Sequence, residues 1–166
     1  MFHVRGFTLI EVLISMVILA IGLLGLAAMQ AISLRDNLDS YNYQQATLLA
    51  YEMQDRIKGN SSANWTGATI GTGDCTKVAP CDSQTMANND YGYWEKSVEA
   101  TLPKPTNTST KMVDIQLSSS VNKAGCKGTY STSLCLITTW ARANNKDSNK
   151  ASKLDNEAHF YLEVTP

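Results

Sequence analysis

The sequence of 166 residues predicts an α+β fold in which a long amino-terminal helix packs on a small antiparallel sheet. Residues 7–29 include 18 apolar residues of 23, and apolar residues then recur at intervals of three and four as far as residue 57. Three later segments, 112–118, 134–141 and 158–164, have the alternation or the composition of β-strands. A sheet on the second half of the helix would bury the apolar faces of both.

The first apolar segment, 7–29, is long enough to cross a membrane, because a helix of this length measures about 34 Å against a hydrocarbon core of ~30 Å. Arg5 precedes the segment and the next basic residue is Arg35, which favours a cytoplasmic amino terminus and places the body of the chain outside. A permanent single-span anchor is one interpretation. A secretory signal peptide cleaved near residues 27–28 is a second, although its apolar region would be unusually long.

A third interpretation is a helix whose carboxylate has a functional partner. It is suggested by Glu11, the only charged residue between Arg5 and Arg35. A carboxylate within a spanning helix is unfavourable and usually has a functional partner. Snorkelling or the helix dipole can also accommodate a lone Glu near the start of a helix. The residues alone leave both explanations open.

Residues 5–14 read Arg-Gly-Phe-Thr-Leu-Ile-Glu-Val-Leu-Ile. This run resembles the class III leader junction of type IV prepilins: a short basic leader ending in Gly, then Phe, then an apolar helix with Glu as its fifth residue. The resemblance implies that a prepilin peptidase cleaves between Gly6 and Phe7, that Phe7 is N-methylated, and that Glu11 acts in subunit docking. The new ammonium at Phe7 and the carboxylate of a neighbouring Glu11 would neutralise each other among apolar helices, where either charge alone is unfavourable.

Residues 22–30 and 46–60 resemble the corresponding runs of PilV-type minor pilins. Residues 22–30 contain Gly22 and Gly25 but no Pro, and the glycines are expected either to loosen the helix or to allow close helix packing. The resemblance implies the type IV pilin "lollipop" and a subunit that primes or caps the pilus, and so serves twitching motility, adhesion or DNA uptake. It divides the chain into a leader peptide 1–6, a transmembrane and filament-core helix 7–29, a periplasmic helix half 30–59 and a globular head 60–166.

The implied partners are other minor pilins, the major pilin and the prepilin peptidase. The implied location is the inner membrane, crossed once with the head in the periplasm, and after assembly the pilus at the cell surface. A pseudopilin of a type II secretion system has the same leader chemistry and remains an alternative. A membrane-anchored periplasmic enzyme or thiol protein is an alternative of another class.

The second half of the long helix is predicted to end at Gly59-Asn60. Its expected apolar stripe consists of Leu34, Leu38, Tyr41, Leu48, Leu49, Met53 and Ile57. Asp55 and Arg56 are expected on a solvated face. A surface loop over 60–82 follows, with Trp65 folded back on the body.

A second helix is expected to be capped by Asp82 or Ser83 and closed by Pro103 and Pro105. The residues that recur at helical spacing in it are Met86, Asp90, Tyr93 or Trp94, Ser97 or Val98, and Leu102. The first strand is expected to point Val113, Ile115 and Leu117 to one side, and the last strand Phe160, Leu162 and Val164. The polar stretch 143–157 is predicted to be a mobile loop.

The four cysteines, Cys75, Cys81, Cys126 and Cys135, lie on the side of the membrane where disulfides persist. The pairs Cys75–Cys81 and Cys126–Cys135 are favoured among three possible pairings, because each pair brackets a turn-rich stretch. A zinc site of four thiolates and a redox-active dithiol are less favoured, since the chain has neither C-x₂₋₄-C nor C-x-x-C.

Composition and motifs do not indicate an enzyme, a metal site or a cofactor. Only His3 and His159 are present, and H-E-x-x-H, P-loop and G-x-S-x-G motifs are absent. With 14 Lys and Arg against 15 Asp and Glu, the net charge of −1 argues against nucleic-acid binding driven by overall charge. A local nucleic-acid patch remains an alternative to ordinary packing for Lys123, Lys127, Tyr130 and Trp140.

Overall fold

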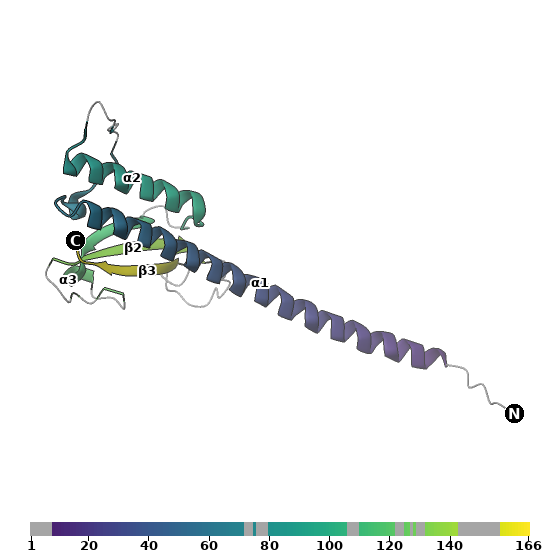
Figure 1. Ribbon diagram of the computed structural model, residues 1–166. Coiled ribbons are helices and arrows are strands. Elements are labelled where there is room, and N and C mark those ends of the chain that lie inside the picture. Colours follow the sequence, from purple (N-terminus) through teal and green to yellow (C-terminus); the bar gives the residue numbers. More distant parts are fainter. Residues whose placement is uncertain are drawn as a thin grey trace. The chain divides into compact units, whose positions relative to one another are not determined.

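The computed structural model describes residues 8–71, 75, 80–105, 110–121, 125–126, 128, 132–142 and 157–166. The predicted leader 1–6, Phe7 and nearly all of the predicted loop 143–157 lie outside these residues. Along the chain, Figure 1 shows α1 (Leu9–Gly59), the short 3₁₀ helix η1 (Trp65–Gly67), α2 (Ser83–Thr101), β1 (Val113–Leu117), α3 (Ser118–Val121), β2 (Leu134–Ala141) and β3 (Glu157–Val164).

The chain forms two compact units, Met1–Leu38 and Asp39–Pro166, and α1 contributes to both. In the first unit the described part consists of Thr8 and the helix from Leu9 onward. The second unit contains the end of α1, α2 and an antiparallel sheet in the order β1-β2-β3. The predicted α+β class, a long amino-terminal helix packed on a small antiparallel sheet, is therefore confirmed.

The face of α1 that packs on the sheet combines small and large apolar side chains. Ala46, Ala50, Met53 and Ile57 are fully buried, and their spacing of four, three and four residues places them on one face. The predicted stripe is correct for Met53 and Ile57 but wrong for Leu48, which is 63% exposed. Leu48 lies two residues from both buried alanines, about 200° around the helix from each.

The predicted stripe also fails nearer the amino terminus, where Leu34, Leu38 and Tyr41 are exposed. The sequence pattern counted large apolar residues, whereas the contact with the sheet uses alanines, which let the helix backbone approach closely. Tyr43 joins this contact, with its ring edge-on to Phe160 at 5.6 Å between centroids.

The sheet presents one apolar face to this core. Its central register aligns Ile115, Leu136 and Leu162 across the three strands. Val164 is buried, and Phe160 and Leu162 pack against the core, as predicted for that face of β3. Leu117 differs from the prediction, because it is 43% exposed at the last position of β1.

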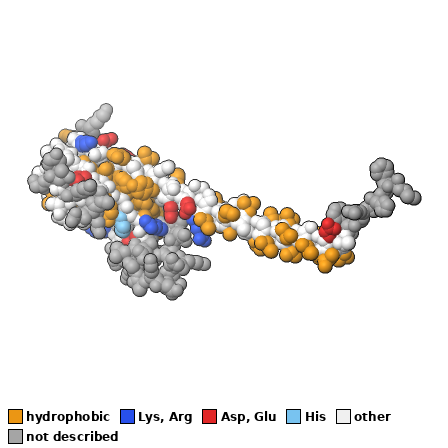
Figure 2. Space-filling view, turned by 90° about the horizontal axis from the view of Figure 1, so that it is seen from below, with side chains coloured by type: hydrophobic (Ala, Val, Ile, Leu, Met, Phe, Trp, Pro, Cys, Tyr) orange, Lys and Arg blue, Asp and Glu red, His pale blue; other side chains and the backbone are white. Residues whose placement is uncertain are grey.

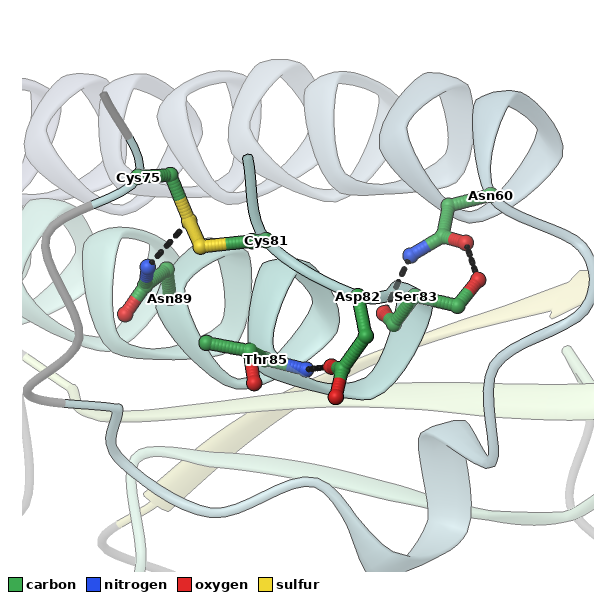
Figure 3. Close-up of a disulfide and its surroundings, with 7 residues drawn as sticks. All are labelled: Asn60, Cys75, Cys81, Asp82, Ser83, Thr85 and Asn89. Atoms are coloured by element: carbon green, nitrogen blue, oxygen red, sulfur yellow. Dashed lines mark hydrogen bonds between the residues drawn. A yellow bond between two sulfur atoms is a disulfide. The ribbon is translucent and has the colours of Figure 1, made fainter. Parts of the chain in front are cut away.

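Helix α2 begins where the sequence predicts, at an Asp82 cap whose Oδ1 accepts a hydrogen bond from the Thr85 backbone N–H at 2.7 Å (Figure 3). That bond holds the pKa of the exposed Asp82 carboxyl below its ordinary value. The buried face of α2 consists of Ala87, Tyr91, Trp94 and Val98, followed by Leu102 at the cap. The predicted face is correct for Val98 and Leu102, and of the alternatives Tyr93 and Trp94 it is Trp94 that is buried. The prediction is wrong for Met86, which is exposed.

Two buried aromatic side chains join the elements of the head. Tyr91 donates a hydrogen bond to the Val113 carbonyl at 3.3 Å, and its burial raises its pKa to about 12. Trp65, in η1, is only 2% exposed and donates from Nε1 to the Asn60 carbonyl at 3.0 Å. The predicted return of Trp65 to the body is confirmed.

Candidate functional site

The amino-terminal part of α1 is the first candidate site. Every residue from Thr8 to Asn37 is exposed in the isolated chain, including large apolar side chains from Leu9 to Leu34. Figure 2 shows hydrophobic side chains along this segment. Soluble monomers rarely expose a continuous apolar surface of this extent, so it needs a lipid or protein partner.

Among the described residues, α1 is the helix long and apolar enough to cross a membrane. Its first turn is anchored by the Thr8 carbonyl, which accepts from the Glu11 backbone N–H at 3.1 Å. Length, composition and position near the amino terminus therefore fit membrane anchoring.

The Glu11 carboxylate lies in this first turn, where the helix dipole favours a negative charge. Ser15 bonds the Glu11 backbone carbonyl, at 2.7 Å, and not its side chain. Val12, Ser15, Met16 and Leu19 line a shallow hollow beside Glu11. Within the described part of the chain the carboxylate has no hydrogen-bond or ion-pair partner, so it is available to a group from another molecule.

Gly22 and Gly25 lie in the exposed amino-terminal part of α1, where no described neighbour requires a glycine. A Cβ atom added at either position would meet nothing within 4 Å. Glycine costs a helix interior about 1 kcal/mol relative to alanine. Their role therefore depends on what surrounds the helix, either a closely approaching neighbour or a segment that loosens.

Gly6 and Phe7, the predicted cleavage and methylation residues, lie outside the described residues. So do Lys123, Lys127 and Tyr130, three of the four residues in the alternative nucleic-acid patch. The fourth, Trp140, is buried in the head core at 2% exposure, as ordinary packing predicts.

The second candidate feature is the contact of α1 with α2. The Asn60 side chain donates from Nδ2 to the Ser83 carbonyl at 2.7 Å and accepts from the Ser83 hydroxyl at 2.5 Å (Figure 3). About one turn before Asn60, Arg56 forms two ion pairs. Its Nη1 lies 2.5 Å from Asp90 Oδ1 on α2, and its Nη2 lies 2.8 Å from Glu52 Oε1 on its own helix.

The expectation that Arg56 lies on a merely solvated face is therefore wrong. The hydrogen bond that Arg56 donates to Glu52 and the interaction with Asp90 raise the pKa of Arg56 above its ordinary value. Sequence reasoning missed this link because the partner, Asp90, is 34 residues away. The available signal was Asp90 itself, the only acidic residue at the helical spacing expected for α2.

The cysteines form two disulfides, Cys75–Cys81 and Cys126–Cys135. These are the pairs favoured from the sequence. Cys126 and Cys135 are completely buried, and Cys135 lies on the central strand β2. Cys75 is exposed and Cys81 half-buried, directly before the Asp82 cap of α2 (Figure 3).

Residues 1–27 match the protein family described as the prokaryotic N-terminal methylation motif. Comparison with curated proteins and with solved structures gives no match. The matched motif is prepilin-like, so it supports a structural, non-enzymatic subunit of the type IV pilin or pseudopilin class. It covers the exposed apolar stretch of α1 as far as residue 27, including Glu11.

Proposed function

We propose that this protein is a minor pilin of the type IV pilus, of the PilV type, and that it acts as a structural subunit in priming or capping pilus assembly. One observation carries the proposal: the methylation motif at residues 1–27 coincides with an exposed apolar helix whose charged side chain, Glu11, lacks a partner among the described residues. The resemblance of residues 22–30 and 46–60 to PilV-type minor pilins supports the specific assignment.

In this proposal the segment 7–29 first crosses the inner membrane, with the head in the periplasm. Prepilin peptidase cleaves after Gly6, and Phe7 becomes the N-methylated amino terminus. Assembly then exchanges lipid for the helices of neighbouring pilins, minor and major. The exchange keeps the apolar side chains of α1 away from water throughout, so its main energetic problem is the burial of charge.

Glu11 resolves that problem by pairing with the Phe7 ammonium of a neighbouring subunit. Two isolated charges among apolar helices are strongly unfavourable, whereas a close pair is tolerated in one relative position only. The pairing therefore selects the axial register of each added subunit. The head, closed by two disulfides, is carried to the cell surface with the pilus, where adhesion, twitching motility or DNA uptake takes place.

A deletion strain tests the pilus assignment. We expect loss of the protein to reduce surface pili, measured by immunoblot of the major pilin in sheared filament fractions, and plasmid-borne expression to restore them. The protein itself is expected in the sheared fraction at low abundance. Normal piliation of the deletion strain, with no subunit in sheared filaments, would refute the assignment.

A pseudopilin of a type II secretion system is the second candidate, because the matched motif is common to both machines. In that case the same deletion strain would keep its pili and lose the export of secreted proteins. Genes for other minor pilins beside this one would favour the pilus, and secretion genes beside it would favour the pseudopilin.

A further inference from the structure

The two disulfides of the head differ in the access that they allow to an attacking thiol. Cys126 and Cys135 are both fully buried, and Cys135 is paired in the sheet between Gln116 of β1 and Glu163 of β3. Cys75 is exposed and Cys81 is half-buried. Thiol–disulfide exchange requires a thiolate to reach one sulfur directly, so in the folded head only Cys75–Cys81 meets this condition.

A side-chain amide is placed against the accessible pair. Asn89, on α2, donates a hydrogen bond from Nδ2 to Cys75 Sγ at 2.9 Å (Figure 3). Hydrogen bonds to an ionised acceptor are about twice as strong as those to a neutral one, so this donor would stabilise a thiolate at Cys75 more than the disulfide sulfur. A stabilised thiolate is a better leaving group, and exchange is faster when the leaving thiol has a lower pKa.

We propose that Cys75–Cys81 is a thiol–disulfide exchange site, which an external dithiol opens and closes on the folded protein while Cys126–Cys135 stays oxidised. A thiolate of the dithiol attacks Cys81 Sγ, the sulfur–sulfur bond breaks, and its electron pair passes to Cys75 Sγ beside Asn89. The second thiol of the reagent then attacks the mixed disulfide and releases Cys81. Two electrons reach the protein, both cysteines take up protons, and the dithiol leaves as a disulfide.

The contact between α1 and α2 does not depend on this bond. Asn60 still bonds Ser83, Arg56 still pairs with Asp90, and the Asp82 cap is formed within α2. Opening the disulfide therefore releases a covalent tie at the start of α2 without removing its noncovalent anchors. The site acts as a reducible link in the head.

Timed alkylation of the full chain in detergent micelles, without denaturant, tests the proposal. The protein is exposed to limiting dithiothreitol and trapped with iodoacetamide, and labelling of each cysteine is measured by peptide mass spectrometry. We expect Cys75 and Cys81 to be labelled at least about tenfold faster than Cys126 and Cys135, whose attack needs local opening of the sheet. Equal rates for the two pairs, or faster labelling of the buried pair, would overturn the proposal.

Asn89→Ala tests the role of the amide donor, and Asn88→Ala is the matched control. Asn88 lies next to Asn89 on α2 and bonds the Thr69 backbone N–H, but it makes no bond to a sulfur atom. We expect Asn89→Ala to slow labelling of Cys75 and Cys81 by about threefold or more, and Asn88→Ala to change it less than about twofold. An unchanged rate in Asn89→Ala would remove Asn89 from the mechanism.

The buried pair serves as an internal reporter of folding in each variant. If Asn89→Ala accelerates labelling of Cys126 and Cys135 as well, the variant has lost its fold, and the near-isosteric Asn89→Asp decides the question. Its carboxylate cannot donate and repels a thiolate, so exchange at Cys75–Cys81 is expected to be slower still. Exchange at the original rate in Asn89→Asp, with the buried pair still protected, would contradict the proposed role.

Discussion

At the residue scale, Glu11 is the only charged residue of the apolar amino-terminal segment, 7–29. Its carboxylate interrupts an apolar helix surface and has no partner within the described residues. It lies within residues 1–27, which match the prokaryotic N-terminal methylation motif, and under the proposed function it is the carboxylate that docks the subunit. Under that proposal Glu11 acts in assembly, whereas within the described residues its carboxylate makes no contact that would stabilise the isolated chain.

Replacing Glu11 with Ala is expected to leave insertion in the inner membrane intact and to reduce incorporation into pili by about tenfold or more, because the neighbouring ammonium then stays unpaired among apolar helices. Immunoblots of membrane and sheared filament fractions measure the two effects separately. Ser15→Ala, one turn away and also polar, is the matched control and should assemble normally. Wild-type incorporation of Glu11→Ala would exclude the docking role.

Asp82 gives the head a defined response to acid. Its folded pKa lies below its ordinary value near 3.8, because the carboxylate accepts the Thr85 backbone N–H. Its stabilisation is therefore present above the unfolded pKa and is lost as pH falls through the folded pKa. Asp82→Asn keeps an acceptor for the cap but does not titrate, so thermal unfolding below about pH 4 should depend less steeply on pH in this variant. Identical pH profiles for the two proteins would contradict the contribution of this cap.

At the element scale, the packing of α1 on the sheet depends on a narrow face of two alanines, Met53 and Ile57. Met53 is the largest fully buried side chain of that face. Leu48, on the same helix, is large and apolar but exposed. The two positions therefore form a matched pair for testing which face of α1 is in the core.

Met53→Ala should lower the free energy of unfolding of the head by about 2–5 kcal/mol, through lost burial and the cavity that remains. Leu48→Ala should change it by less than about 0.5 kcal/mol. Urea unfolding of the full chain in micelles, followed by the fluorescence of the buried Trp65, Trp94 and Trp140, provides the measurement. A larger loss at Leu48 than at Met53 would mean that the opposite face of α1 contacts the sheet.

The same comparison explains how far the sequence predicts this fold. Alternation locates the strands within a residue or two, the turn-rich stretches indicate the cysteine pairs, and the Asp82 cap and the end at Gly59 follow from local chemistry. The buried face of α1 follows only at Met53 and Ile57, because the alanines that continue it carry no strong pattern. For the link from Arg56 to Asp90, the sequence offers Asp90 as a candidate partner, but the pairing itself depends on how two helices pack side by side.

At the scale of the whole molecule, the two compact units differ in how their apolar side chains are exposed. All buried apolar residues of the described chain lie from Ala46 onward, in the second unit. The exposed apolar side chains of Leu9–Leu34 lie in the first. The amino-terminal segment therefore needs a lipid or protein partner, whereas the head has its own core and two disulfides.

Removal of residues 1–29 should give a protein that is soluble without detergent, unfolds cooperatively and forms both disulfides, because every described residue that is removed, 8–29, is exposed. Thermal unfolding followed by circular dichroism, with peptide mapping of the cysteines, checks both points. Aggregation or a different cysteine pairing would show that the head needs the first part of α1 to fold.

The most direct test of the pilin assignment is the amino terminus of the protein recovered from sheared pili, read by mass spectrometry. We expect the chain to begin at Phe7 with a methylated amine, and to retain residues 1–6 in a strain without prepilin peptidase. A chain that begins at Met1 in the wild type, or near residue 28, would contradict the account and favour a membrane-anchored or secreted protein of another class.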